Sequence, residues 1–78
     1  MRILVVEDHR KIAESIKIGL EKEGFEVLCA YDGGSALDSL ESISFDCVLL
    51  DIMLPDISGY ELCKYIRNDL ANAVPIIM

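Results

Sequence analysis

Residues 45–62 read FDCVLLDIMLPDISGYEL, and this stretch decides the fold class. Within it, the fully apolar run 47–50 ends at Asp51, and Pro55 follows four residues later. Such a run is typical of a strand covered on both faces, and proline cannot donate the hydrogen bond that would extend it. Apolar residues then recur at helical spacing through 62–70. The stretch therefore predicts a buried strand, a loop and an amphipathic helix.

The same alternation continues on both sides of this stretch. Apolar runs at 3–6, 25–29 and 74–78 predict three further strands, and helical spacing predicts helices around 12–20 and 36–43. The order strand, helix, strand, helix, strand, helix, strand predicts an α/β fold with a parallel sheet and helices on both faces. In the run at 25–29, one of the two strand faces is less apolar than the other, which predicts a place near the sheet edge.

Residues that favour helix starts and stops lie at the predicted boundaries. One apolar helix face is predicted from three residues spaced four apart: Ile12, Ile16 and Leu20. Gly24 follows this helix as a C-cap, and Asp32, Gly33 and Gly34 indicate a turn before the next helix. Asp56 and Ser58 are the candidate N-caps of the third helix.

Length and composition restrict the class of protein. The chain has 78 residues, enough for one small domain, and its 53% apolar residues exclude a disordered tail. A net charge of −7 disfavours nonspecific attraction to nucleic acid or to an anionic membrane, and favours an acidic patch or a cation site. The apolar runs are far shorter than the ~20 residues of a membrane-spanning helix, and Glu7 interrupts the first run before a signal peptide could form. We therefore predict a cytoplasmic protein.

The cysteines of the chain lack the spacing of a metal or redox motif. There are three of them, an odd number, at Cys29, Cys47 and Cys63. This pattern fits reduced thiols better than disulfides or a zinc site. Since each lies in a predicted strand or on an apolar helix face, we predict buried core thiols without a redox role.

Acidic residues follow two of the predicted buried strands. Glu7 and Asp8 end the first strand, and Asp51 ends the third. Because ligands of an open parallel sheet bind beyond the carboxyl ends of the strands, these carboxylates meet if the two strands are neighbours. Their mutual repulsion then requires a proton or a cation, and Mg²⁺ suits a site with few oxygen ligands. The alternative is that each carboxylate only caps a helix or faces solvent.

Three segments resemble those of a known family. ILVVEDH, at 3–9, is similar to the first strand and acidic pair of bacterial two-component response regulator receiver domains, and AYDGGSAL, at 30–37, resembles their turn into the second helix. Residues 45–62 resemble the phosphoacceptor segment of the family. That motif is highly specific, because it combines a buried strand, a terminal Asp, a Pro four residues later and a Gly eight residues later.

The resemblance covers essentially all of residues 1–78 and implies the N-terminal part of a receiver domain. The expected fold is the flavodoxin-like, CheY-like receiver fold, ending after its fourth strand, whereas five strand and helix units need roughly 120 residues. The last helix, strand and helix, with the hydroxyl and lysine residues of the family site, are then expected outside the chain, as is any output domain. A fourth strand without a covering helix predicts a homodimer or a segment-exchanged oligomer.

The resemblance also implies a role for each residue of the acidic site. Asp51 is expected to accept a phosphoryl group from a sensor histidine kinase as an acyl phosphate. Asp8 and Asp51 are expected to ligate Mg²⁺, with Glu7 acting through a water. Met53 is expected to bind the ion through its backbone carbonyl, with its side chain pointing away. A carboxylate can serve as nucleophile, and phosphoryl transfer depends mainly on positioning and charge neutralisation.

Other residues near the site have simpler interpretations. Pro55 and Gly59 are expected to shape the loop over the site, through a rigid exit from the strand and close packing of the next helix. His9 is interpreted as a solvated residue or a helix-start contact, and not as a ligand or phosphoryl donor. Gly33 and Gly34 are interpreted as turn residues, because neither GxGxxG nor the P-loop lysine pattern is present.

Three functions are compatible with these residues. The resemblance implies phosphorelay signal transduction that regulates an output domain, with transcription as the expected output. A phosphorylation-independent interaction module of the same fold is the second function. An aspartate-nucleophile phosphatase of the haloacid dehalogenase type is the third, but that class needs a second Asp where Met53 stands. We therefore expect a signalling domain that is not an enzyme, with a histidine kinase as partner and DNA contact only through an output domain.

Overall fold

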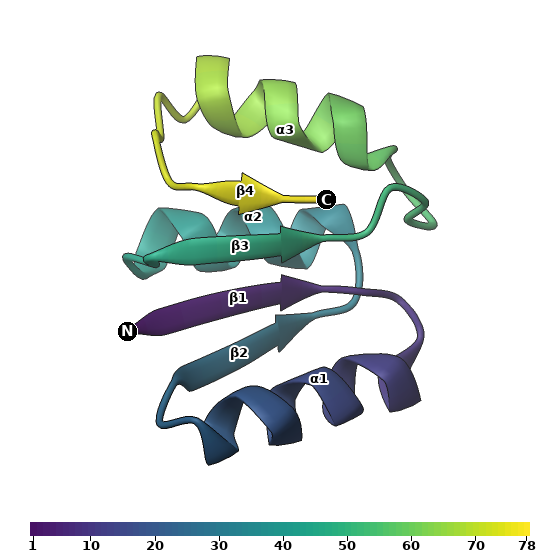
Figure 1. Cartoon of the computed structure of the whole chain (residues 1–78). Coiled ribbons are helices and arrows are strands. Elements are labelled where there is room, and N and C mark those ends of the chain that lie inside the picture. Colours follow the sequence, from purple (N-terminus) through teal and green to yellow (C-terminus); the bar gives the residue numbers. More distant parts are fainter.

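One parallel sheet forms the centre of the molecule, with helices packed on both of its faces (Figure 1). The structure is a computed structural model that describes all of residues 1–78. Its elements are β1 (Arg2–Val6), α1 (Arg10–Lys22), β2 (Glu26–Ala30), α2 (Gly33–Ser42), β3 (Cys47–Leu50), α3 (Gly59–Asn68) and β4 (Ile76–Ile77). The strands are all parallel in the order β2-β1-β3-β4, which confirms the α/β prediction and the edge position of β2. None of the helices has the length and apolarity needed to cross a bilayer.

The central strand β1 is covered on both sides. Successive side chains of a strand face opposite sides of the sheet, so β1 contributes to two hydrophobic clusters. Leu4 and Val6 pack with residues of α2 and α3 on one face. Ile3 and Val5 pack with Ala13 of α1 on the other. This double burial explains why the run is apolar without alternation.

The buried face of α1 is centred one residue away from the predicted face. Ala13 is fully buried, Ile16 and Leu20 are half-buried beside it, and Ile12 is 48% exposed. The prediction that Ile12 lies on the apolar face is therefore wrong, because a four-residue spacing drifts around a helix that has 3.6 residues per turn. The helix ends as predicted, since Gly24 adopts a φ of 90° and its N–H donates to the last turn.

The glycine pair opens α2 and does not form a turn before it. Asp32 is the N-cap, and its side chain accepts a hydrogen bond from the N–H of Ser35 at 2.7 Å. Gly33 and Gly34 are the first two helical residues, so their assignment to a turn was wrong. At α3, Ser58 is the N-cap, and its Oγ accepts from the N–H three residues later at 3.1 Å.

Strand β4 is shorter and more exposed than the predicted strand 74–78. Only Ile76 and Ile77 pair with β3. Val74 is buried before the strand begins, whereas Ile77 is 60% exposed. The predicted burial fails at Ile77 because α1 packs mainly over β1 and β2 and leaves this part of the sheet face uncovered.

The three thiols are free, as predicted, but they are half-buried and not fully buried. The Sγ of Cys29 lies 3.9 Å from the carbonyl oxygen of Ala13 in the helix that covers it. Burial raises the pKa of the Cys29 thiol above its usual value. A raised pKa disfavours the reactive thiolate, which agrees with a packing role for Cys29.

Ala71 holds the connection between α3 and β4 in a left-handed conformation, with a φ of 49°. Replacing Ala71 by glycine is expected to raise the free energy of unfolding by about 1 kcal/mol, because glycine adopts a positive φ without a Cβ clash. Urea unfolding measures the change. Ala73→Gly, at an exposed position of the same connection without a positive φ, is the control and is expected to lower stability. Equal losses in the two variants would contradict the prediction.

Candidate functional site

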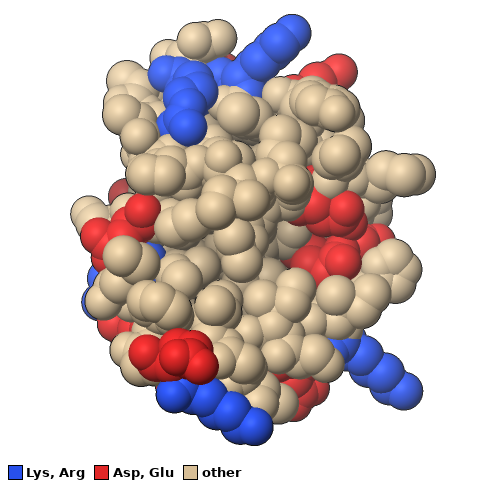
Figure 2. Space-filling model, in the orientation of Figure 1, with Lys and Arg blue, Asp and Glu red and all other residues tan.

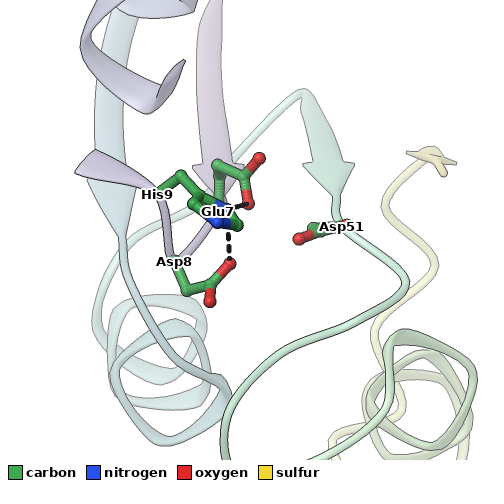
Figure 3. A group of neighbouring side chains, drawn as sticks. All are labelled: Glu7, Asp8, His9 and Asp51. Atoms are coloured by element: carbon green, nitrogen blue, oxygen red, sulfur yellow. Dashed lines mark ion pairs between the residues drawn. The ribbon is translucent and has the colours of Figure 1, made fainter. Parts of the chain in front are cut away.

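The carboxyl ends of β1 and β3 bring acidic side chains together (Figure 3). The two strands are neighbours, with Val6 opposite Leu50, so Glu7 and Asp51 leave the sheet side by side. The N–H of Asp51 still donates to the carbonyl of Val6, at 2.9 Å, which holds Asp51 at the end of the ladder. The first and third strands are thus adjacent, which meets the condition for the carboxylates to come together.

The cluster contains four side chains. One potential ligand atom from each of Glu7, Asp8, His9 and Asp51 lies within 4.8 Å of the others. All three carboxylate residues are half-buried, and the side chain of Glu7 is only 14% exposed. The cluster lines a pocket of about 460 Å³, which the loop residues Met53, Leu54 and Pro55 also line. Figure 2 shows Asp and Glu side chains gathered at this edge of the sheet, toward which the strand arrows of Figure 1 point.

Two carboxylate oxygens of the cluster have no hydrogen-bond partner. Glu7 Oε2 and Asp8 Oδ1 are both buried and accept no hydrogen bond, although His9 Nδ1 lies within 4 Å of each. Buried polar atoms are normally hydrogen-bonded, and converging carboxylates require a proton or a cation. A hard divalent cation such as Mg²⁺ fits this donor set, because the carboxylates offer only oxygen and waters can complete an octahedral shell.

His9 lies beside the acidic residues at the start of α1. Its Nδ1 is 3.2 Å from Asp8 Oδ1 and 3.7 Å from Glu7 Oε2, although neither oxygen accepts a hydrogen bond (Figure 3). The imidazole is 69% exposed, and His9 occupies the N-cap position without capping the helix through its side chain. This agrees with the interpretation of His9 as a solvated helix-start residue, whereas its approach to two carboxylates was not predicted.

Burial raises the pKa of Glu7 above its usual value, and the neighbouring carboxylate of Asp51 raises it further. Protonated Glu7 therefore stabilises the fold, and the contribution is fully present at a pH below the usual pKa of a glutamate. It is lost as the pH rises through the raised pKa of Glu7 in the folded protein. Glu7→Gln is expected to remove this pH dependence. It is also expected to raise the free energy of unfolding at neutral pH by about 1 kcal/mol, the size of one close repulsion in water.

Urea unfolding of the metal-free protein from acidic to neutral pH measures the effect of Glu7→Gln. Glu14→Gln, which removes an exposed carboxylate from α1, is the matched control and is expected to keep the pH dependence. A difference in stability between the wild type and Glu7→Gln that does not change with pH would contradict the prediction.

The loop from Asp51 to Ser58 folds back on itself beside the pocket. Met53 and Ser58 form an isolated antiparallel bridge, and the N–H of Gly59 donates to the carbonyl of Ile52 at 2.6 Å. A Cβ on Gly59 would lie 2.5 Å from the carbonyl oxygen of Asp51, so this position has no room for a side chain. The side chain of Met53 is 79% exposed, and its N–H lies 3.4 Å from Asp51 Oδ1.

Asp56 makes a contact that the sequence patterns did not predict. Its Oδ1 accepts a hydrogen bond from the N–H of Gly33 at 2.9 Å, and its Oδ2 accepts from the N–H of Gly34 at 3.0 Å. The carboxylate thus binds the N-terminus of α2, where unpaired N–H groups and the helix dipole favour an anion. These hydrogen bonds, that of Gly33 foremost, hold the pKa of Asp56 below its usual value. The glycine pair after Asp32 marks the start of the helix, but no sequence feature indicates that Asp56 binds there.

Known proteins are similar to this chain in both sequence and fold. The sequence model of the response regulator receiver domain family matches residues 3–78. One similar structure is that of the response regulator protein TrrA from Thermotoga maritima in complex with Mg²⁺-BeF. Its sequence is 42% identical to this chain, and the TM-score is 0.91. The alignment covers 99% of this chain and 66% of that one. A CheY-like receiver domain protein from Methanospirillum hungatei is 40% identical, with a TM-score of 0.92 and coverage of 99% and 61%.

A further similar structure contains the histidine kinase ThkA in complex with TrrA. Its matched chain is 41% identical in sequence to the present chain, with a TM-score of 0.88. The alignment covers 96% of the present chain and 64% of the matched one. These similarities confirm the predicted receiver fold. The present chain spans between three fifths and two thirds of the length of the structures it matches.

Proposed function

This chain belongs to the response regulator receiver domain family, and on that basis we propose that Asp51 accepts a phosphoryl group in a Mg²⁺-dependent reaction. The observation that carries the proposal is the convergence of Glu7, Asp8 and Asp51 at one sheet edge, with two buried oxygens that accept no hydrogen bond. Isolated carboxylates at strand ends would face solvent or cap helices. A shared cation explains why three of them meet.

The chemistry assigned to Asp51 is nucleophilic attack on phosphorus. One carboxylate oxygen forms a P–O bond while the P–N bond of a phosphohistidine breaks, and the electron pair of that bond returns to the imidazole. The product is an aspartyl phosphate. Asp51 lies at the wall of an open pocket, which leaves room for a phosphoryl donor to approach in line.

The other residues of the site are proposed to hold the cation and the loop. Asp8 and Asp51 supply direct carboxylate ligands, Glu7 acts through a water, and Met53 contributes its backbone carbonyl. When bound, Mg²⁺ neutralises the charge that develops on the transferred phosphoryl group. The exposed Met53 side chain leaves its carbonyl as the group available for this role. Pro55 and Gly59 are proposed to shape the loop, because Gly59 packs directly against the Asp51 backbone.

The proposed partner is a sensor histidine kinase. Support comes from the structure of the histidine kinase ThkA in complex with the response regulator TrrA, which matches this chain at 41% sequence identity. We propose that phosphorylation regulates an output domain with a role in transcription, in the cytoplasm, and that any DNA contact belongs to that domain. A homodimer or segment-exchanged oligomer remains a prediction from the exposed edge of β4.

Intact mass spectrometry after incubation with acetyl phosphate and Mg²⁺ tests the proposal. It is run on this chain and on the full-length protein, because the chain spans less than two thirds of its solved relatives. We expect the full-length protein to gain one phosphoryl group that maps to the peptide containing Asp51 and that is absent when a chelator removes Mg²⁺.

Two other outcomes would overturn this proposal. A folded, Mg²⁺-binding full-length protein that takes no label would favour the phosphorylation-independent interaction module. Continuous release of phosphate from a phosphate monoester would favour the phosphatase, for which Met53 replaces the required second Asp.

A further inference from the structure

The loop segment 53–55, which forms one wall of the acidic pocket, is held at two places. At its base, the hydrogen bond from Gly59 and the bridge to Ser58 close the loop. At its tip, the Asp56 carboxylate binds the first two N–H groups of α2, 22 and 23 residues away in the chain. The wall of the pocket is therefore tied to a helix that contributes no residue to the acidic cluster.

We propose that Asp56 is a positioning residue, which fixes the pocket wall 53–55 against α2 and thereby sets the affinity of the acidic site for Mg²⁺. The inference rests on the proposed function, because Met53 in this wall is the residue assigned a carbonyl ligand. Asp56 acts only through the loop, since both of its oxygens are engaged by α2.

The start of α2 is built to receive this carboxylate. The first N–H groups of a helix have no partner within the helix. Here the side chain of the cap residue Asp32 accepts only from Ser35, and the N–H groups of Gly33 and Gly34 are left for Asp56. The N–H of Ala36 already donates to the backbone carbonyl of Asp32. Asp56 thus completes the hydrogen bonding of the first turn from a distant loop, and charge-assisted bonds of this kind are among the stronger ones.

The two glycines differ in how closely the loop approaches them. A Cβ on Gly33 would collide with Cγ2 of Ile57, next to Asp56 in the loop tip. A Cβ on Gly34 would meet nothing nearer than 3.6 Å, which is ordinary contact. An alanine at 33 should therefore displace the tip of the loop, whereas an alanine at 34 should leave it docked. Adjacent positions of one helix thus provide a test and its matched control.

Loss of the tip contact has a defined consequence for the pocket. The base of the loop stays closed, so the segment can rock about Ile52 and Gly59, which are joined at 2.6 Å. Met53, which pairs with Ser58 next to this hinge, moves with the rocking segment, so its carbonyl would no longer be held at one distance from Asp8 and Asp51. Residues that orient a ligand from outside the coordination shell typically change metal affinity by about tenfold or more.

Titration with Mg²⁺ alone, followed by amide chemical shifts, tests the proposal. We expect Asp56→Ala and Gly33→Ala each to weaken binding about tenfold. Asp38→Asn, which removes an exposed carboxylate from α2, and Gly34→Ala are expected to bind as the wild type does. The double variant Asp56→Ala with Gly33→Ala should be no weaker than either single variant, because both break the same contact.

A second readout separates positioning from loss of structure. In the acetyl phosphate reaction of the full-length protein, Asp56→Ala should need more Mg²⁺ yet reach the wild-type maximal rate. Asp56→Asn, which keeps one acceptor oxygen, should fall between wild type and Asp56→Ala in Mg²⁺ affinity. Should Asp56→Ala not fold, Asp56→Asn and Gly33→Ala carry the same comparison.

The outcomes distinguish this inference from the proposed function. If Mg²⁺ binds the wild type but Asp56→Ala and Gly33→Ala bind it as tightly as their controls do, Asp56 does not position the site. A lowered maximal rate with unchanged Mg²⁺ affinity would equally overturn the inference. Wild-type protein that neither binds Mg²⁺ nor is labelled at Asp51 would instead refute the proposed function itself.

Discussion

Asparagine in place of Asp51 is expected to abolish phosphoryl uptake completely. The carboxylate oxygen is the proposed nucleophile, and an amide oxygen in the same position is far less nucleophilic and carries no charge for the cation. Because Asp51 also raises the pKa of Glu7, the substitution should bring the pKa of Glu7 closer to its usual value. Removal of one of the converging charges should raise the stability of the metal-free protein by about 1 kcal/mol. The variant is thus expected to be inactive and well folded.

Intact mass after incubation with acetyl phosphate and Mg²⁺ measures this loss in the full-length protein. Asp69→Asn, which removes an exposed carboxylate at the end of α3, is the control and should be labelled as the wild type is. Label that persists in Asp51→Asn would reject Asp51 as the acceptor. Peptide mapping would then decide whether His9, which lies in the same cluster, carries the group.

The central strands were predictable because burial on both sides leaves a simple pattern. The runs at 3–6 and 47–50 are apolar without interruption, and each ends at an acidic residue. Parallel strands place their carboxyl ends at one edge, so the meeting of Glu7 with Asp51 follows from the order of the strands alone. The metal-site hypothesis therefore depended on topology and required no knowledge of side-chain geometry.

Features that depend on contacts between distant loops were not predictable. The residues around Asp56 indicate a helix cap, but they do not indicate that its carboxylate binds the two glycines at the start of α2. Spacing alone also misplaced Ile12, because the buried face of α1 is decided by what packs on it. At β4, local pattern predicted burial that depends on a covering helix, and Ile77 lacks one. In each case the deciding partner is remote in sequence.

The role of Gly59 lies between these cases, since close packing of the next helix was expected from the sequence, whereas the backbone atoms that Gly59 meets were not. Replacing Gly59 by alanine is expected to lower the free energy of unfolding by about 3 kcal/mol, the upper end of the usual cost of overpacking. A Cβ there would lie 2.5 Å from the carbonyl oxygen of Asp51 and 2.8 Å from Cα of Ile52. Both are backbone atoms, which cannot turn aside as a flexible side chain would.

This loss is large for a chain of 78 residues, whose total stability is expected to be roughly 4–12 kcal/mol. Urea unfolding measures it, with Gly19→Ala as the control. A Cβ at Gly19 meets nothing within 4 Å, so alanine there should raise stability by about 1 kcal/mol through its helix propensity. Mg²⁺ should bind Gly59→Ala more weakly as well, because the alanine pushes against the backbone of Asp51. Equal stability of the two alanine variants would show that the loop yields at Gly59, and that the close approach of α3 does not fix the position of Asp51.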